Sequence, residues 1–300
     1  MDNPNLKRPH SISELRTAMR KLVTPESFER GLSIEVRPSD VFISPYAKCG
    51  TTWLQHVAHG LRSNGSTAFG EVSDVVPWLE IAFDLGVDPD AEQDWSPRLF
   101  KAHLNWQDVP KGGRYVVAFR DPKAVLVSMY QFFEGWFFEP GTITLDELGR
   151  QFFLDTNRYY QHILSWAPVI NEPDVLALAY EDMVQSPDRL PGALAEFLQL
   201  DLNDEQMAKV IFQSSRDYMV TNATKFDGHD IREKRDLIMG LPPGGSSLKV
   251  QRANSNKPIF SSQLAAEFDE VWRQTIMPVL GAASYEEFHE SLPNPLEVSR

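Results

Sequence analysis

A lysine, a glycine and two threonines stand where a short apolar run gives way to a helical pattern. The stretch VFISPYAKCGTTWLQHVAHGL, residues 41–61, holds Lys48, Gly50, Thr51 and Thr52. Amides at the start of a helix have no partner inside it, and the helix dipole favours negative charge there. Glycine lets a ligand approach the backbone, and the other side chains add donors and positive charge. The loop predicts a phosphate or sulfate site; the alternative is an ordinary capped helix with a solvated lysine.

The loop is not a Walker A motif, because Lys48 precedes Gly50 by two residues instead of following a glycine directly.

A second polar set follows the apolar run YVVAF. Arg120 comes directly after that run, and Ser128 comes eight residues later, about two helical turns on. The planar fork of arginine suits phosphate. The alternative here is a strand-end arginine paired with Asp121.

A third set, Lys101 and His103 in FKAHL, lies between the other two in the sequence. A lone histidine is more often structural than catalytic. This one is expected near the carboxyl end of a strand, and its ordinary pKa of about 6.5 suits a general base. The aromatic residues Trp53 and Tyr180, taken by themselves, fit plain core packing.

The elements that must hold these residues are strands alternating with helices. Apolar runs without strict alternation predict strands buried on both faces, at 40–45, 98–103, 115–119 and 174–180. Helices are expected at 52–63, from Pro122 onward, at 145–166, at 186–200 with Ser186 or Asp188 as the cap, at 203–213 and at 261–277.

This alternation predicts an α/β fold, a single domain with a central parallel β-sheet flanked by helices. Ligands of such sheets bind beyond the carboxyl ends of the strands, so the turns at 45–52 and 119–123 should open onto one crevice. Residues 239–258 are rich in Gly, Pro and Ser, and we interpret them as a long loop that acts as a lid.

Composition narrows the class of protein. The chain has 300 residues, 42% of them hydrophobic, and a formal net charge of −13, which disfavours nucleic acid as a partner. The single cysteine excludes an intrachain disulfide and argues against a cysteine-based zinc site. The N-terminal residues lack the apolar segment of a signal peptide, and no stretch is apolar enough to span a membrane. A cytoplasmic protein without a membrane partner is expected.

Several of these motifs resemble those of the cytosolic sulfotransferase family. SPYAKCGTTW is similar to its 5′-phosphosulfate loop, Y-P-K-[SC]-G-T-T-W, with Ala47 in place of the proline. RDPKAVLVS is similar to its 3′-phosphate motif, R-D-P-x-x-x-x-x-S. FKAHL resembles a K-x-H-L segment whose histidine is the general base, and LAYEDM resembles a segment whose tyrosine contacts adenine. SSRDYM, at 214–219, is a weaker match to another nucleotide-contacting turn.

The resemblance implies a sulfotransferase that uses 3′-phosphoadenosine 5′-phosphosulfate (PAPS), releases adenosine 3′,5′-bisphosphate (PAP), needs no metal and sulfates a hydroxyl or amine of a small apolar acceptor. It implies His103, Lys48 and Lys101 as catalytic residues. It implies donor-binding roles for Lys48, Cys49, Gly50, Thr51, Thr52, Trp53, Arg120, Ser128, Tyr180, Ser214, Lys249 and Arg252. The domain would span 38–280, between an N-terminal extension with a first helix (1–37) and a C-terminal tail (281–300).

The resemblance fails in two places. The family's C-terminal signature, R-K-G-x-x-G-x-W-K, is replaced by KVQRANSNKPIFS, so either Lys249 or Arg252 is the candidate ligand of the 3′-phosphate. The family's dimer motif, K-x-x-x-T-V-x-x-x-E, is degraded, with Glu267 one residue late. A monomer or weak homodimer is expected.

Other patterns have two readings each. His56 and His59 are either metal ligands or, as we favour, part of a solvated helix face. DGHD, at 227–230, is either an ion site or a turn. The aromatic segments 75–83 and 135–141 are either core or the wall of an acceptor pocket, which we favour. The rival functions are a P-loop kinase of a small molecule, a catalytically silent nucleotide-binding protein, and an enzyme that sulfates transiently to drive elimination.

Overall fold

A parallel sheet forms the centre of the protein. The structure is a computed structural model that describes residues 6–22, 24–244 and 259–297. Within them the strands pair in the order β2-β1-β3-β4, all parallel. They are β1 (Val41–Ile43), β2 (Leu99–Lys101), β3 (Arg114–Phe119) and β4 (Val175–Ala179). The predicted fold class and all four predicted strands are confirmed.

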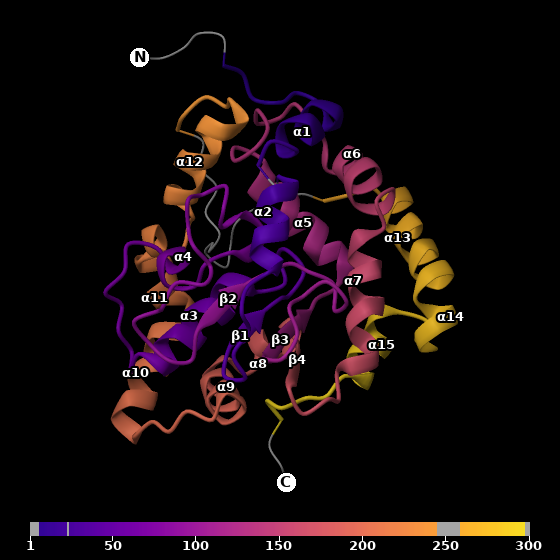
Figure 1. Ribbon diagram of the computed structural model, residues 1–300. Coiled ribbons are helices and arrows are strands. Elements are labelled where there is room, and N and C mark those ends of the chain that lie inside the picture. The colour runs from indigo at the N-terminus through magenta and orange to yellow at the C-terminus, as the bar shows by residue number, and fades with distance from the viewer. Residues whose placement is uncertain (1–5, 23, 245–258, 298–300) are drawn as a thin grey trace.

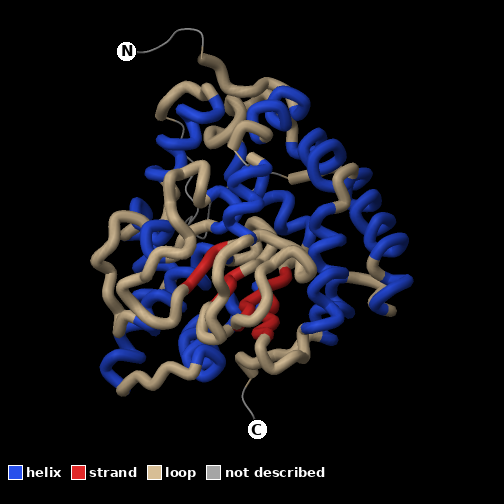
Figure 2. The backbone as a smooth tube through the Cα atoms, in the orientation of Figure 1, coloured by secondary structure: helices blue, strands red, loops and turns tan. Residues whose placement is uncertain are grey.

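Helices cover both faces of this sheet (Figures 1 and 2). One face carries α3 (Thr51–Arg62), α8 (Tyr180–Gln185), α9 (Leu190–Leu198) and α10 (Asp204–Ser214). The other carries α1 (Ile12–Met19), α5 (Pro122–Phe133), the π-helical η2 (Leu148–Leu154), α7 (Arg158–Trp166), α13 (Ser262–Thr275) and α15 (Tyr285–Ser291). The remaining helical segments are α2 (Pro25–Leu32), α4 (Val72–Val75), η1 (Leu79–Ile81), α6 (Leu145–Glu147), η3 (Ala167–Val169), η4 (Pro187–Arg189), α11 (Arg216–Thr221), η5 (Ala223–Lys225), α12 (His229–Met239) and α14 (Met277–Leu280).

The strands lie between two hydrophobic cores, one on each face of the sheet. In β1, Phe42 faces one core while Val41 and Ile43 face the other, and all three are fully buried. Every residue of β4 is buried as well. This explains why the runs lack alternation, since a strand covered on both faces needs apolar residues at every position.

Two expected helices differ in detail. The helix expected over 145–166 is interrupted: the π-helical η2 follows α6, and Asn157, with a φ of 52°, separates η2 from α7. The expected cap of the 186–200 helix is wrong, because Arg189 occupies the position before α9 and no side chain caps it. Ser186 instead precedes the short η4, again without a side-chain cap hydrogen bond.

The two ends of the chain pack onto the same core as the middle. Ile12 and Leu15 of α1 and Phe288 of α15 are buried in the core cluster that contains Phe42 and Phe119. The division of the chain at residues 37 and 280 remains a prediction. No helix in the described part of the chain is both long and apolar enough to cross a membrane.

A buried ion pair joins the starts of β1 and β2. Asp40 and Arg98 each precede their strand by one residue, and both side chains are at most 4% exposed. Arg98 donates to both carboxylate oxygens, at 2.9 and 2.6 Å. Its Nη2 also donates to the carbonyl of Glu35. The pair therefore fixes the register of the strands whose far ends carry the loop at 45–50 and His103.

Replacing Asp40 by alanine should destabilise the protein by about 3–5 kcal/mol, because it leaves the Arg98 charge buried without its partner. Urea denaturation followed by tryptophan fluorescence would measure this. The matched control is Glu92→Ala, which breaks an exposed ion pair with Arg37 and should leave the midpoint almost unchanged. Equal, small effects of both substitutions would contradict a structural role for the buried pair.

Candidate active site

One large cavity opens at the carboxyl ends of the strands. Its volume is about 1470 Å³, and residues from the ends of all four strands line it. The predicted crevice shared by the turns after β1 and β3 is therefore present. Of the residues expected at the site, the lining includes Lys48, Gly50, Thr51, Thr52, Trp53, Lys101, His103, Arg120, Ser128, Tyr180 and Ser214. Lys249 and Arg252 lie outside the described residues.

The loop after β1 is held in an unusual backbone conformation. Lys48 has a φ of 73° and Gly50, which precedes α3, a φ of 91°. A Cβ on Gly50 would lie 3.1 Å from the ring of Tyr180, so glycine is needed both for the angle and for the space. The hydroxyl oxygen of Thr51 is buried without a hydrogen-bond partner. The loop thus forms a tight cradle with an unsatisfied buried hydroxyl, as expected of a site that binds an anion.

Cys49 differs from its neighbours in the loop. Its side chain is fully buried against the hydroxyl of Tyr159 and is absent from the cavity lining. Burial raises the pKa of its thiol to about 12. The backbone amide of Cys49 donates to the carbonyl of Tyr46, at 3.1 Å. Cys49 therefore shapes the turn, and its thiol stays protonated and away from the cavity.

Arg120 ties the loop to the end of β3. Its Nη1 donates to the carbonyl oxygen of Lys48 at 2.8 Å, and its guanidinium lies 4.1 Å from the centre of the Tyr180 ring. The hydroxyl of Tyr159 donates to the backbone carbonyl of Arg120 and accepts from its amide, at 3.0 Å for the latter. Asp121 instead caps α5 through the amide of Ala124, so it does not neutralise the arginine by a direct hydrogen bond.

His103 is oriented by the backbone. Its Nδ1 lies 2.7 Å from the carbonyl oxygen of Pro45. A carbonyl only accepts hydrogen bonds, so Nδ1 carries the proton and Nε2 is the basic nitrogen of the neutral ring. The buried carboxylate of Glu80 accepts the backbone N–H of His103 at 2.6 Å, and burial raises the pKa of Glu80. The ring of Trp78 lies 5.3 Å from the His103 ring and 3.5 Å from Nζ of Lys101.

Aromatic side chains form the rest of the cavity wall. The ring of Phe132 lies 4.2 Å from Nζ of Lys48 and 3.9 Å from the ring of Trp136. Trp136 and Phe137 line the cavity from the segment 135–141, and Trp78 lines it from 75–83. The aromatic-rich segments thus serve both as core and as the wall of a pocket next to His103.

Comparison with known proteins agrees with this geometry. The sequence model of the family described as "Sulfotransferase domain" matches residues 38–278. The chain belongs to this sulfotransferase family. Sulfotransferase 1B1 of Canis lupus familiaris is 30% identical over 233 residues, which cover 73% of this chain and 76% of that protein. Sulfotransferase 2A1 of Homo sapiens is 28% identical over 247 residues, covering 77% and 86% respectively.

Solved structures show the same fold. Retinol dehydratase in a complex with retinol and PAP superposes with a TM-score of 0.67 at 15% identity, covering 92% of this chain and 98% of that one. Mouse sulfotransferase SULT7A1 complexed with PAP gives 0.62 at 21% identity, covering 90% and 95%. Family membership confirms the enzyme class expected from the sequence, a PAPS-dependent sulfotransferase, with PAPS as co-substrate and PAP as product.

The expectation that His56 and His59 lie on a solvated face is wrong. Both side chains of this sulfotransferase are buried, because α3 is enclosed by the sheet, α10 and the segment that contains Phe69. His56 Nε2 lies 3.0 Å from the carbonyl of Gln213, and Arg62 Nε donates to His59 Nδ1 at 3.3 Å. Burial lowers their pKa values to about 4 and 3. They are neutral core residues of the enzyme.

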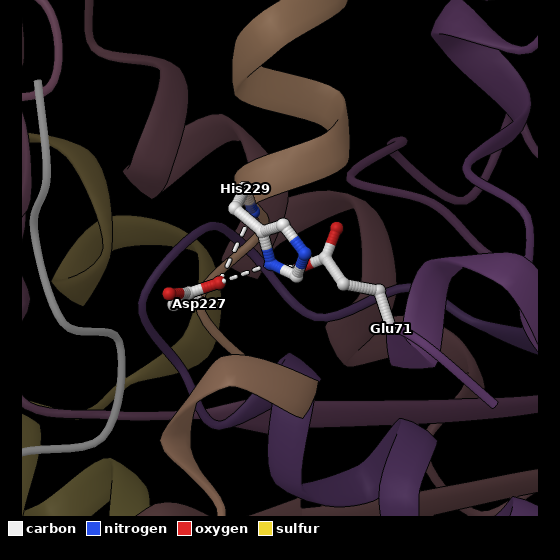
Figure 3. A group of neighbouring side chains, drawn as sticks. All are labelled: Glu71, Asp227 and His229. Carbon is white, nitrogen blue, oxygen red and sulfur yellow. Dashed lines mark hydrogen bonds and ion pairs between the residues drawn. The ribbon is translucent and has the colours of Figure 1, made fainter. Parts of the chain in front are cut away.

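The DGHD segment starts a helix and belongs to a side-chain cluster. In the described part of the chain, Glu71, Asp227 and His229 form the one group whose potential metal-ligand atoms all lie within 4.8 Å of each other (Figure 3). Asp227 Oδ1 lies 2.9 Å from His229 Nδ1 and accepts the His229 backbone N–H at 3.1 Å. Chiefly through this carboxylate, the pKa of His229 is raised. The imidazole of His229 therefore favours its protonated form, whereas a histidine that binds a metal must offer an unprotonated nitrogen. The contacts of Asp227 with His229 instead stabilise the start of α12.

Three supporting residues of the sulfotransferase site had no role assigned from the sequence, although Glu181 lies within LAYEDM and Glu80 within the aromatic segment 75–83. They are Tyr159, which clamps the backbone of Arg120, Glu80, which holds that of His103, and Glu181. Glu181 accepts the N–H of Asp121 at 3.1 Å and the hydroxyl of Tyr285, in α15, at 2.7 Å. Their partners are far away in the sequence, so no local pattern marks these contacts. Glu267, from the degraded dimer motif, pairs with Arg150 of the same chain.

Replacing Gly50 by alanine should weaken PAP binding by at least about tenfold, since the strained φ alone costs about 1–3 kcal/mol and Tyr180 must move. Calorimetric titration with PAP would measure this. Gly192→Ala is the matched control, because a Cβ there meets no neighbouring atom within 4 Å. Wild-type affinity in Gly50→Ala would mean that the loop does not depend on this backbone conformation.

Proposed function

We propose that this sulfotransferase moves the sulfuryl group of PAPS onto a hydroxyl, or an amine, of a small acceptor with an apolar body, with His103 as the general base. The observation that carries the proposal is that one cavity joins three things: the loop at Lys48, the oriented ring of His103 and the aromatic wall at Trp136. A donor bound in the loop and an acceptor bound against the wall would then meet beside the histidine.

The donor end suits a nucleotide with phosphates at both ends of its ribose. Gly50 leaves the room that a Cβ would fill, and the unsatisfied hydroxyl of Thr51 is the kind of donor that a phosphosulfate would accept from. We assign the 5′-phosphosulfate to Lys48, Thr51 and Thr52, and the 3′-phosphate to Arg120 and Ser128. The adenine contacts are assigned to Tyr180 and Trp53, and a phosphate contact to Ser214, with Lys249 or Arg252 closing over the 3′-phosphate.

The chemistry needs proton removal and charge stabilisation. Nε2 of His103 takes the proton of the acceptor hydroxyl as its oxygen bonds to sulfur, while the bond from sulfur to the bridging oxygen of the donor breaks. The transfer resembles phosphoryl transfer, in line and loose, so positioning matters most. Lys48 and the threonine hydroxyls meet the negative charge that grows on the departing phosphate. Lys101, held over the ring of Trp78, steadies the sulfuryl oxygens or orients His103.

Three rival functions named from the sequence can be tested at the same site. Elimination after transient sulfation uses the same donor, and retinol dehydratase shares the fold; chemical identification of the product separates it from stable sulfation. A kinase would consume ATP, and a silent nucleotide-binding protein would bind PAP and transfer nothing. Incubation with PAPS and a panel of phenols and alcohols, with ATP in parallel and products identified by mass spectrometry, distinguishes all of them.

His103→Ala should lower turnover by at least about 100-fold, the scale of general-base catalysis, while PAP binding is retained. Sulfation rates at saturating PAPS and a PAP titration would measure both. The matched control is His10→Ala, which changes an exposed histidine that is not among the residues lining the cavity and should behave as wild type. Turnover within a few-fold of wild type in His103→Ala would remove His103 as the base.

Arg120→Ala should weaken PAP by about 10- to 100-fold, the scale of a charge-assisted hydrogen bond, and should weaken AMP, which lacks the 3′-phosphate, much less. Calorimetric titration of both nucleotides without added metal is the measurement. Arg114→Ala, at the opposite end of β3, is the control. If both nucleotides lost affinity equally, Arg120 would act by holding the Lys48 carbonyl and not by binding the 3′-phosphate.

A further inference from the structure

A buried arginine lies in the wall of the cavity away from the donor loop. Arg235, in α12, is 1% exposed, yet it is among the residues that line the cavity. Its guanidinium lies 4.8 Å from the ring centres of both Trp136 and Phe137. The start of α12 is tied to a distant segment by the backbone N–H of Asp230, which donates to Glu71 at 3.2 Å. No step of the proposed transfer uses Arg235.

The hydrogen bonds of Arg235 are incomplete. Its Nη2 donates to the carbonyl oxygen of Trp136 at 2.9 Å, and Nε and Nη2 both donate to Oδ1 of Asp236. Its Nη1 has no partner in the protein, although it is buried. The carboxylate of Asp236 does not hydrogen-bond to Nη1, because only its Oδ1 contacts Arg235. The other carboxylate oxygen, Oδ2, has no hydrogen-bond partner either. Buried donors in native proteins are nearly always satisfied, so an acceptor from a bound ligand is the natural complement.

The charge around Arg235 is positive. The groups that face it are Asp236, Arg8 and Arg232. Arg8 is also buried, and it donates to the carbonyls of Trp136 and Pro242. Burial lowers the pKa of Arg235 to about 10, which leaves it protonated at neutral pH. Two buried arginines thus donate to the same carbonyl, that of Trp136, and only Arg235 has a hydrogen-bonded carboxylate, Asp236. A ligand carboxylate would balance this excess of buried positive charge.

The lining of the whole cavity also carries more positive than negative side chains. It contains two carboxylates, Asp108 and Asp188, against Arg16, Arg20, Lys48, Lys101, Arg120, Arg158, Arg216 and Arg235. The whole chain has the opposite bias, a net charge of −13. The phosphate and sulfate groups of PAPS would neutralise the cations near the loop at Lys48. Arg235 is separated from that end by rings, since Phe132 contacts Lys48 on one side and Trp136 on the other.

We propose that Arg235 binds a carboxylate of the acceptor, so that the acceptor class is an aromatic or similarly apolar hydroxy acid. Its hydroxyl would lie beside His103, its apolar body against Trp136 and Phe137, and its carboxylate at Nη1 of Arg235. This inference rests on the proposed sulfuryl transfer and narrows its substrate. An acid group remote from the reacting hydroxyl distinguishes the class from neutral phenols, alcohols and steroids.

The test compares acids with their own amides. The probes are the 4-hydroxyphenyl derivatives of acetic, propanoic and butanoic acid, each beside its primary amide, with PAPS as donor. In the wild-type enzyme, kcat/KM for the best acid should exceed that for its amide by about 10- to 100-fold, the scale of a hydrogen bond between charged groups. In Arg235→Gln this ratio should fall to within about threefold of one, and Arg235→Lys should restore part of it.

The control variant is Lys234→Gln, which removes a positive charge from an exposed position of the same helix and should keep the wild-type ratio. Arg235→Gln leaves Asp236 without its partner, so thermal melting must first show that this variant is folded. If Arg235→Gln does not fold, Arg235→Lys is the second variant, and its acid-to-amide ratio should fall below that of the wild type. Equal kcat/KM values for acid and amide in the wild type would overturn the proposal.

Binding measured without turnover separates this inference from the proposed function. The acids and amides are titrated into the PAP complex, with the fluorescence of the cavity tryptophans as the readout. Selective binding of an acid without sulfation would support the Arg235 site and contradict the general transferase proposal. Sulfation of neutral phenols with no preference for acids would support the proposed sulfuryl transfer and contradict the Arg235 carboxylate site. PAP binding without binding of any acid would overturn the inference.

Discussion

The hydrogen bond from Arg120 to the carbonyl oxygen of Lys48 is the contact on which the site depends. It joins the loop after β1 to the end of β3, two segments 72 residues apart. The left-handed conformations of Lys48 and Gly50 turn the chain so that this carbonyl faces the arginine while the start of α3 faces the cavity. Tyr180, from the end of β4, closes the arrangement by packing against both Gly50 and Arg120. Three strand ends are thus held in one cradle.

The donor end was predictable because its chemistry is local. In a parallel sheet each strand end supplies a short loop, and the residues of that loop are neighbours in the sequence. Lys48, Gly50 and Thr51 could therefore be recognised together, as could Arg120 with Ser128, and the structure places all five on the cavity. The four strands were predictable for a related reason, since burial on both faces leaves an unbroken apolar run.

The expectation for one face of α3 failed because packing between distant segments hides a polar pattern, and the expected cap of α9 failed within a single turn. The face of α3 with His56 and His59 looks polar in the sequence, but α10 and an aromatic segment cover it. The start of α9 has residues suited to capping at Ser186 and Asp188, but Arg189 takes the position. Tyr159, Glu80 and Glu181 support the site through partners 23 to 104 residues away, and no periodicity or motif records such a distance.

The same contrast explains why the proposed acceptor end was anticipated only in part, through the aromatic segments 75–83 and 135–141. Its wall combines Phe28 of α2, Trp78 before η1, Trp136 after α5 and Arg235 of α12, each from a different part of the chain. Apolar residues in such places are indistinguishable from core, and an arginine in a charged helix is indistinguishable from a surface residue. Only the folded chain shows that Arg235 is enclosed by two rings with one donor unsatisfied. The proposed donor and acceptor ends of the cavity are therefore built from different segments, one from loops at the strand ends and the other from helices and loops that meet only in the folded chain.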